Sequence, residues 1–399
     1  MIVNSSHQTI LFENFMDIQH LRLGILGGGQ LGKMLALAAH KWDITTTILD
    51  PDKQCPASNV CTNFVHGDFT DYDTVYKFGK TTDILTIEIE KVNVEALLKL
   101  EEEGLVVHPS PHAIKIIGDK GDQRVFLDEA GIPGPEYQIA DSKEHILELV
   151  QKNKIKIPFV QKLRTGGYDG RGVFIVRSED DLDELLEGPS LIEELVDIEK
   201  ELAVVAARGD NDEIKCFAPV EMVFKREANL LDYLMSPASL TQGQEIRATQ
   251  IAIETIKKFK MQGLLAVELF LTRNNKILVN EVAPRPHNSG HHTIEANATS
   301  QYEQLLRSIL GIPLGNTEQD GIGLMANLLG EPQANGKPNY QGLQQCLSQQ
   351  GINIHIYGKR KVTPYRKMGH VTITAPALSE AKEKLKYVRE NLRIVSYDE

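Results

Sequence analysis

The sequence predicts a chain of mixed α/β and α+β structure. In roughly the first quarter, short apolar runs alternate with helical segments, which is typical of a parallel sheet with helices on its faces. In the middle, several apolar runs follow one another closely, which favours antiparallel strands. The 399 residues are enough for two or three domains, and 41% hydrophobic residues can supply their cores.

The first part of the chain has the alternating pattern. Residues 1–20 precede the first strand, and we assign no function to this extension. Pro109-Ser-Pro111 interrupts the alternation, so we expect an α/β domain over residues 21–110. Its expected elements are strands at 21–26, 45–50 and 83–90 and helices at 33–41 and 92–103.

The middle and last parts are expected to be α+β. Residues 111–315 form the second domain, which ends at a Gly-Ile-Pro-Leu-Gly segment, and residues 316–399 form a small third domain. Ser178 is expected to cap a helix that runs to about residue 187. The other expected elements are strands at 157–163, 173–176, 190–195, 201–207, 214–221, 352–357 and 370–374 and helices at 244–260 and 379–392.

Composition excludes several classes of protein. The net charge of −12 argues against general nucleic-acid binding, and the apolar runs fall short of the ~20 residues of a membrane helix. The first Lys or Arg is Arg22, so the beginning of the chain does not resemble a secretory signal. The four cysteines have neither CxxC nor zinc-like spacing, which favours a reducing cytoplasm.

Two acids lie in neighbouring apolar strands that a tight hairpin joins. If Asn274–Asn275 form a two-residue turn, Arg273 pairs with Lys276. Counting outward then places Glu268 opposite Glu281. Opposed residues hold their Cβ atoms about 4.5–5.5 Å apart, where like charges repel. Such a pair needs a shared proton or a cation, and Mg²⁺, which usually brings phosphates, suits oxygen ligands.

The turn Gly27–Gly32 ends the first strand and opens a helix. It matches GxGxxG, and Asp50 stands about twenty residues further on, where a dinucleotide's ribose is held. A plain tight turn with no cofactor explains the glycines equally well. A third alternative, which we prefer, is a phosphate of another ligand at the helix N-terminus.

The loop Thr165–Gly172 has four glycines in eight residues between two strands. A plain hairpin needs fewer residues. Glycines let backbone N–H groups approach phosphates closely and let a flap close over them. Lys162, on the preceding strand, is placed to reach a phosphate, so we favour a nucleotide cradle that is not a P-loop.

The segment Leu191–Val196 is an apolar strand interrupted by two acids, and Glu201 follows it. As an edge strand it would offer its backbone to an adenine, while a carboxylate accepts from both ribose hydroxyls. The alternative is a solvated edge strand without a ligand. The neighbouring glycine loop and the acid pair favour nucleotide binding over the solvated edge strand.

Polar residues are dense directly after the strand that ends at Glu281. They lie on a proline-containing coil without cysteine, which argues against a zinc site. Arg285, four residues after Glu281, better suits an anion clamp for a phosphoryl group or an acyl oxyanion. The other polar residues of this stretch are His287, Asn288, His291 and His292.

The segment Tyr357–His370 carries five Lys or Arg residues in an otherwise acidic chain. A solvated run of charge is the usual explanation. Glycines and a proline fix this segment between two strands, however, and that suits a phosphate pocket.

Four motifs together carry a resemblance that none carries alone. They are GGGQLGKM at 27–34, KLRTGGYDGRG at 162–172, NEVAPRPHNSGHH at 280–292 and RKMGHVT at 366–372. In this order they resemble the N5-carboxyaminoimidazole ribonucleotide synthetase family of ATP-grasp enzymes. The resemblance covers roughly residues 21–392.

This resemblance implies a three-domain ATP-grasp architecture: a pre-ATP-grasp parallel sheet, the ATP-grasp domain and a small C-terminal domain. It implies an ATP-dependent carbon–nitrogen ligase of purine biosynthesis. Such an enzyme carboxylates 5-aminoimidazole ribonucleotide with bicarbonate, through carboxyphosphate. It also implies ATP and Mg²⁺ as cofactors and a cytoplasmic homodimer, with neither nucleic acid nor membrane as a partner.

The resemblance also assigns residues. Magnesium is assigned to Glu268 and Glu281, and catalysis to Arg285, Arg171, Asp169 and Tyr168. The nucleotide is assigned to Lys120, Lys162, Gly167, Tyr168, Asp169, Gly170, Arg171, Gly172, Val173, Glu193, Glu194, Leu195, Val196, Glu201, Asn280 and Glu281. The aminoimidazole ribonucleotide is assigned to Gly29, Gln30, Leu31, His287, Asn288, Lys359 and Arg366, of which the last two would take its 5′-phosphate.

Three departures from the family pattern accompany these assignments. Ala283 stands where many ATP-grasp enzymes have a metal-binding Asn, so Glu281 is expected to bridge two ions. The stretch after Glu221 lacks a nucleotide-contacting histidine that is often present. Lys120 stands where arginine is also usual, which loses bidentate geometry.

Three other functions compete with this one. A related ATP-grasp ligase would use formate and glycinamide ribonucleotide, but the 280–292 and 366–370 segments favour the first reading. An NAD-dependent oxidoreductase would use the Gly27 turn and leaves both glutamates without a role. A regulatory nucleotide-binding protein would not need the full set of charged residues.

Overall fold

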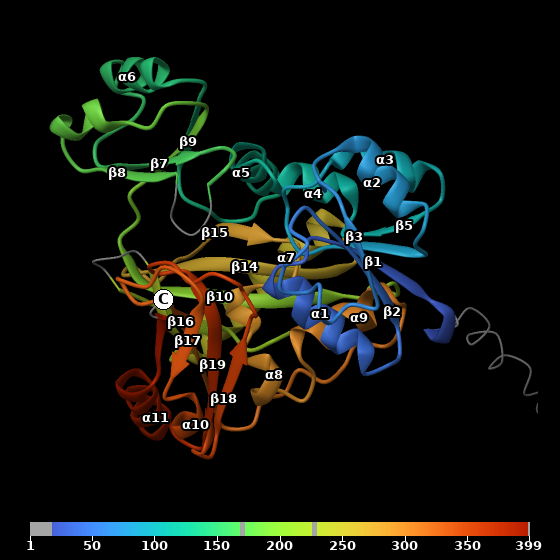
Figure 1. Cartoon of the computed structure of the whole chain (residues 1–399). Coiled ribbons are helices and arrows are strands. Elements are labelled where there is room, and N and C mark those ends of the chain that lie inside the picture. The colour runs from blue at the N-terminus through green and yellow to red at the C-terminus, as the bar shows by residue number, and fades with distance from the viewer. Residues whose placement is uncertain (1–17, 168–171, 226–229, 398–399) are drawn as a thin grey trace, which may run out of the picture.

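The computed structural model describes residues 18–167, 172–225 and 230–397 (Figure 1). The first part is a parallel sheet of five strands in the order β3-β2-β1-β4-β5. One apolar cluster packs α1 on one face, and a second packs α2 and α3 on the other. The bounds are η1 (Ile18–His20), β1 (Arg22–Leu26), α1 (Gln30–His40), β2 (Thr45–Asp50), β3 (Asn63–His66), α2 (Tyr72–Gly79), β4 (Ile84–Ile87), α3 (Val94–Glu102), β5 (Val106–His108) and α4 (Pro111–Ile117).

A small antiparallel sheet stands at the upper left of Figure 1, with strand order β6-β9-β7-β8. β9 lies between β6 and β7. The edge strand expected over 191–196 is therefore wrong, because both sides of β9 already carry partners. The bounds are α5 (Lys120–Glu129), β6 (Tyr137–Ala140), α6 (Lys143–Gln151), β7 (Phe159–Leu163), β8 (Val173–Val176), η2 (Glu179–Glu184) and β9 (Ser190–Glu194).

The largest sheet joins the middle of the chain to its last part. Its order is β15-β14-β10-β12-β13-β16-β19-β18, with β11 paired to β10. Residues of α7 and α5 share an apolar cluster with one side of this sheet, and α9 belongs to another. The bounds are β10 (Ile198–Arg208), β11 (Ile214–Cys216), β12 (Val220–Lys225), β13 (Leu230–Ser236), α7 (Gln242–Phe259), β14 (Gly263–Thr272), β15 (Ile277–Ala283), η3 (Asn288–Gly290), α8 (Thr293–Ala296) and α9 (Gln301–Ile309).

The last part contributes strands to this same sheet. β13 pairs with β16 from Leu234–Met325 to Ser236–Gly323, and β19 and β18 follow. Residues of α11 and α10 pack with these strands in a cluster of their own, and β17 pairs with β20 beside it. The bounds are β16 (Ile322–Leu329), β17 (Pro338–Gln341), α10 (Leu343–Leu347), β18 (Ile352–Ile356), β19 (Lys367–Ala375), α11 (Leu378–Asn391) and β20 (Arg393–Ser396).

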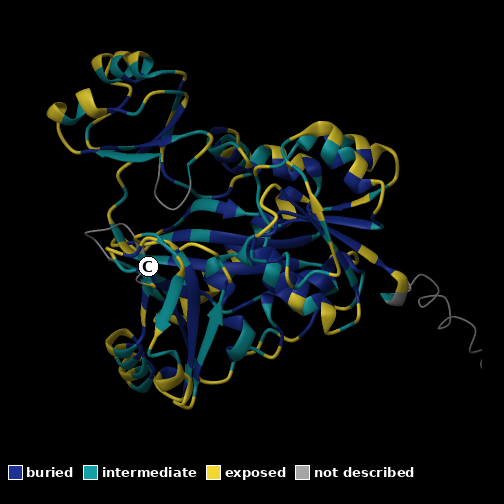
Figure 2. Cartoon of the chain, viewed as in Figure 1, coloured by how far each residue is buried: buried dark blue, intermediate teal, exposed yellow. Residues whose placement is uncertain are grey.

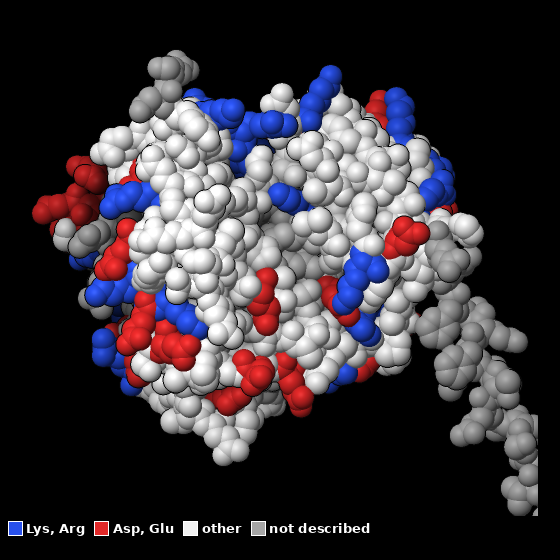
Figure 3. Space-filling view, turned by 60° about the horizontal axis from the view of Figure 1, so that its bottom comes forward, with Lys and Arg blue, Asp and Glu red and all other residues white. Residues whose placement is uncertain are grey.

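Burial follows the sheets, whose strands are mostly buried while the outer helix faces are exposed (Figure 2). The face shown in Figure 3 carries both signs of charge, separated by broad uncharged areas. Every helix in the described parts of the chain is too short or too polar to span a bilayer.

The fold class is confirmed, and two of the expected elements are wrong in kind. The helix expected to follow Ser178 is a 3₁₀ helix that ends at Glu184, although Ser178 and Asp181 do form its capping box. The single strand expected over 214–221 is two strands, β11 and β12. Pro219 lies between them, and without an N–H it cannot continue a ladder.

Candidate active site

The hairpin of β14 and β15 brings the two acids together through a bulge. Its loop has three residues, 273–275, rather than the expected two, because Leu271 pairs with Ile277 and the Thr272 N–H donates to the Lys276 carbonyl oxygen at 2.9 Å. The register shifts between Val267 and Leu269, so that Asn280 and Glu281 together lie opposite Glu268. The two-residue turn was wrong, yet the bulge compensates for the extra loop residue and restores the expected neighbourhood of the two acids.

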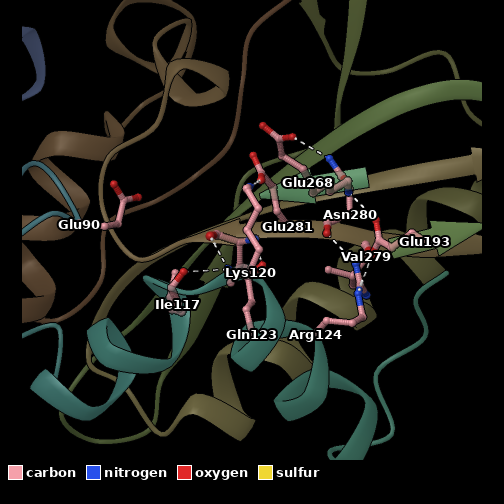
Figure 4. A network of polar contacts seen from close by, with 12 residues as sticks. Glu90, Ile117, Lys120, Gln123, Arg124, Glu193, Glu268, Val279, Asn280 and Glu281 are labelled. Atoms are coloured by element: carbon pink, nitrogen blue, oxygen red, sulfur yellow. Dashed lines mark hydrogen bonds and ion pairs between the residues drawn. The ribbon is translucent and has the colours of Figure 1, made fainter. Parts of the chain in front are cut away.

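Ammonium groups from two other elements reach the bulged strand, and Figure 4 shows one of them, Lys120, beside Glu281. Lys120, at the start of α5, forms a salt bridge with Glu281. Lys162, on β7, donates to Asn280 Oδ1 at 2.8 Å. The Asn280 amide in turn donates to Glu268 Oε2 at 3.3 Å. The structure thus gathers five predicted site residues around one bulge: Lys120, Lys162, Glu268, Asn280 and Glu281.

Arg124 and Gln123 form hydrogen bonds with the bulged strand β15. Neither was predicted from the sequence to support the site. Arg124 donates to the carbonyl oxygens of Val279 and Asn280 at 2.8 and 2.7 Å. Gln123 accepts from the Val282 N–H at 3.0 Å. Both side chains lie on α5, a helix that the sequence analysis did not predict. Its signature is the N-cap Asp119, whose carboxylate accepts from two backbone amides of the first turn.

Glu193 is a buried structural acid as well as a predicted nucleotide contact. Its side chain is 2% exposed, with Arg124 Nε at 2.8 Å from one oxygen and Lys162 Nζ at 2.5 Å from the other. The Arg124 N–H is not aligned for a hydrogen bond, so the first contact is an ion pair only. The Glu193 carboxylate therefore points to the charged cluster, and the β9 backbone is already paired on both sides with β6 and β7.

The two opposed acids differ in protonation. Burial raises the pKa of Glu268 to about 8, and the charge of Glu281 adds to this. Burial also acts against ionisation of Glu281, but the Lys120 ammonium outweighs it and lowers the pKa of Glu281 to about 2. The proton on Glu268 and the ammonium of Lys120 thus offset the negative charge of the two carboxylates.

Glu201, on β10, is the third acid of the cluster. Burial raises its pKa to about 7, against the opposing effect of Lys162. Its pairing with Phe270 of β14 places it two residues along the sheet from Glu268, which pairs with Ala203. The acid predicted for the ribose therefore lies in the same compartment as the acids predicted for the metal.

The donor set fits a magnesium ion that shares its coordination with phosphates. Glu268 and Glu281 offer carboxylate oxygens, the ligands that Mg²⁺ prefers. Within the described residues, His, Cys, Asp and Glu do not gather in threes at any place that could hold a metal unaided. Magnesium in proteins usually takes one or two carboxylates and completes its shell with water and substrate phosphates.

Arg285 and His287 lie on the coil that follows β15. The Arg285 guanidinium lies 2.8 Å from a carboxylate oxygen of Glu90, which follows β4 of the first part. His287 Nε2 lies 3.6 Å from Glu268 Oε1, and its Nδ1 contacts the Ser289 hydroxyl. Asn288 opens the 3₁₀ turn η3 next to it. This coil joins the first part to the metal-ligand candidates.

The glycine turn is occupied by the protein's own acids. Asp50 Oδ2 accepts from Gly28 N–H at 2.7 Å, and Glu88 accepts from Gly29 and Gly32 at 3.0 and 2.9 Å. These three amides are thus already bonded, which argues against a dinucleotide pyrophosphate on them. Gln30, which begins α1, is half-buried and Leu31 is buried.

The remaining predicted residues lie at two places. Tyr168, Asp169, Gly170 and Arg171 lie outside the described residues. Gly167 and Gly172 close the base of that loop, where a Cβ on Gly172 would meet Gly167 Cα at 3.3 Å. Val173 begins β8.

Lys359 and Arg366 follow β18, and the exposed Arg366 donates to Lys361 O at 2.7 Å.

Models of three protein families match the chain. They are a ribonucleotide synthetase preATP-grasp domain over 21–118, an ATP-grasp domain over 125–302 and a phosphoribosylaminoimidazole carboxylase C-terminal domain over 323–384. Two crystal structures of N5-carboxyaminoimidazole ribonucleotide synthetases or synthases resemble it over nearly their whole length. The one from Thermotoga maritima is 40% identical, with a TM-score of 0.86, and covers 94% of this chain and 100% of its own. The one from Aspergillus clavatus, in complex with ADP and 5-aminoimidazole ribonucleotide, is 31% identical, with a TM-score of 0.84, and covers 93% and 98%.

Curated relatives agree with the structures. The chloroplastic phosphoribosylaminoimidazole carboxylase of Vigna aconitifolia is 37% identical over 92% of this chain, which spans only 66% of that protein. The N5-carboxyaminoimidazole ribonucleotide synthase of Bacillus subtilis is 34% identical, over 88% of this chain and 90% of its own length. By its domains, its relatives and its fold, the chain belongs to the N5-carboxyaminoimidazole ribonucleotide synthase family of ATP-grasp ligases.

Proposed function

We propose that this chain carboxylates 5-aminoimidazole ribonucleotide to N5-carboxyaminoimidazole ribonucleotide, with bicarbonate and ATP, in purine biosynthesis. The observation that carries the proposal is the bulge that sets Glu268 beside Glu281, with ammonium groups from two further elements at the same point. Paired acids with two lysines suit the phosphates of a nucleoside triphosphate and a magnesium ion.

The first step transfers the γ-phosphoryl group. A bicarbonate oxygen attacks the γ-phosphorus, the bond to the β-phosphate oxygen breaks, and ADP and carboxyphosphate form. Magnesium, held by Glu268 and Glu281, would neutralise charge on the phosphates. Lys120 and Lys162 would position the phosphates, and Arg285 would hold the bicarbonate oxygens by a planar fork of donors.

The second step forms the carbon–nitrogen bond. The exocyclic amine of the ribonucleotide attacks the carboxyl carbon, phosphate leaves, and the amine loses a proton. His287 and Asn288 would line the site of the imidazole, and Lys359 and Arg366 would take the 5′-phosphate. Gly167 and Gly172 would offer backbone N–H groups to the phosphates, and Glu201 would accept from the ribose of ATP.

The proposal extends to a cytoplasmic homodimer, both features following the family resemblance. Four cysteines that are all free support a reducing compartment. Gel filtration with light scattering tests the dimer, and a mass equal to one chain of 44.5 kDa would contradict it.

One assay tests the reaction itself. ADP release is measured with aminoimidazole ribonucleotide plus bicarbonate, with glycinamide ribonucleotide plus formate, and with ATP alone. We expect stimulation by the first pair only, with loss of the signal when Mg²⁺ is chelated. Stimulation by formate and glycinamide ribonucleotide alone would replace this substrate assignment with that of the competing ligase.

A further inference from the structure

Lys33 of the GGGQLGKM motif joins the first part of the molecule to the last. It lies in the first turn of α1, and its ammonium donates to the carbonyl oxygens of Ile356 and Tyr357 at 2.9 and 3.2 Å. These carbonyls stand at the end of β18, 323 and 324 residues further along the chain. The lysine is therefore a cross-link between α1 and the segment that carries the basic residues after β18.

Tyr357 itself is held rigidly. Its side chain is 1% exposed, and its hydroxyl lies 3.1 Å from Nδ1 of His370 on β19. The His370 ring is fully buried and stacks on His355 with ring centroids 4.4 Å apart. Its other face neighbours His291, at 4.6 Å between centroids. The tyrosine ring thus has a fixed place at the boundary of two parts of the molecule.

Lys359 lies over this fixed ring. Gly358 has a φ of +86°, a left-handed conformation that favours glycine and turns the chain back. Lys359 Nζ is then 5.5 Å from the centroid of the Tyr357 ring, within the range of a cation–π contact. A Cβ on Gly358 would lie 3.5 Å from Lys33 Nζ, so the cross-link and the turn are in direct contact.

We propose that Lys33 and Tyr357 are positioning residues that hold the Lys359 ammonium ready for the 5′-phosphate of the ribonucleotide. Lys33 fixes the backbone from which Lys359 departs, and the Tyr357 ring supports its charged end. A free lysine side chain loses rotamer freedom when it binds an anion, and fixing it beforehand removes part of that cost. This inference rests on the proposed function, because it concerns the same phosphate.

The test is a double-mutant cycle with a matched substrate pair. The variants are K33M, K359A and K33M/K359A, assayed with the ribonucleotide and with the ribonucleoside that lacks the 5′-phosphate. We expect K33M to raise the ribonucleotide KM about tenfold, because the Lys359 ammonium is displaced from the 5′-phosphate but not removed. The ATP KM should not change. With K359A already present, K33M should add nothing, and neither variant should alter turnover of the ribonucleoside.

Two outcomes would overturn the proposal. If K33M raises the ribonucleotide KM as much in the K359A background as in the parent chain, Lys33 acts without Lys359. If K33M impairs the ribonucleoside as much as the ribonucleotide, its role is general structure. A parent chain without any ribonucleotide-dependent ADP release would instead refute the proposed function, so the two failures are distinct.

Conservative and control variants separate the positioning role of Lys33 and Tyr357 from general effects on the structure. K33R retains donors for both carbonyls and should restore most of the ribonucleotide affinity. Y357F retains the ring and should be milder than Y357L, which removes it. K41M changes an exposed lysine at the C-terminal cap of the same helix and should leave every KM unaltered. G358A offers a second route if K33M does not fold, and an unchanged ribonucleotide KM in a folded G358A would count against the proposal.

Discussion

The guanidinium of Arg124 and the carboxylate of Glu193 form an ion pair in the interior, 2.8 Å between Nε and Oε1, with side chains 3% and 2% exposed. The pair connects α5 to β9 of the small sheet. Since Glu193 also contacts Lys162, and Arg124 also bonds the Asn280 carbonyl, a closed loop of contacts fixes the small sheet against the bulged strand. Stability and the proposed nucleotide binding therefore depend on the same acid.

The change Glu193→Gln should destabilise the protein by about 3–5 kcal/mol, because it leaves the buried Arg124 charge uncompensated. The same variant should raise the KM for ATP, since Lys162 loses its second partner. Urea unfolding and initial-rate kinetics measure the two effects. The exposed neighbour Glu194 is the control, and Glu194→Gln should change stability by no more than about 0.5 kcal/mol. Equal small changes in both variants would refute the role of the pair.

The change Glu281→Gln should lower kcat at least about a hundredfold. Replacing a residue that only hydrogen-bonds to a metal ligand typically lowers metal affinity or activity by about 10–100-fold, and losing a direct ligand should lower it more. Binding of Mn²⁺ in the presence of ADP, followed by electron paramagnetic resonance, should weaken in parallel. The exposed Glu129 on α5 serves as control, and Glu129→Gln should bind Mn²⁺ normally. Undiminished Mn²⁺ binding by the Glu281 variant would contradict the metal assignment.

Stability should fall as pH rises, in a manner that depends on Glu201. Its pKa is about 7 in the folded chain against an ordinary value of 4.5, so between these pH values the folded state keeps a proton that the unfolded state releases. The contribution is complete below about pH 4.5 and lost by about pH 7. For a partly exposed group the loss is about 1–3 kcal/mol.

Urea unfolding of the metal-free protein at several pH values between 4.5 and 8 measures this effect. The variant Glu201→Gln cannot ionise, so its stability relative to the parent chain should increase as pH rises and then level off near pH 7. Titrating groups that the Glu201 charge does not reach are common to both proteins and cancel in the difference, whereas Glu268, whose pKa of about 8 the Glu201 charge helps to raise, contributes mainly above pH 7. A difference independent of pH would show that the Glu201 carboxyl is not perturbed by burial.

Asp50 should be a structural residue rather than a ribose ligand. Its carboxylate accepts from the backbone N–H groups of Gly28 and Asp52, both at 2.7 Å. Losing hydrogen bonds to a charged group costs about 1.5–3 kcal/mol, so Asp50→Asn should lower the free energy of unfolding by that amount. The KM values for ATP and for the ribonucleotide should stay within about twofold of the parent. A KM change with unaltered stability would assign Asp50 to a ligand instead.

Much of this molecule follows from local sequence patterns. Strand β2 and helix α1 were predicted because apolar runs, glycine turns and helical periodicity act over a few residues. The family was identified because four motifs occur in one order. The helix α5 was missed, although it carries Lys120 and both residues that brace β15. The first turn of α5 is polar, so its apolar face is short. The capping residue Asp119 was therefore a stronger indication of a helix here than the apolar periodicity.

The sequence alone determined which residue types are present for phosphate, metal and anion chemistry, because motifs record side-chain identity and spacing. Tertiary structure alone decided the register that sets Glu268 beside Glu281, since a three-residue loop and a bulge cancel each other only when distant groups such as Gln123 bind the shifted strand. It also decided that Glu193 faces inward and that Lys33 reaches β18. These contacts join segments far apart in the chain, and their energies depend on packing that no short pattern encodes.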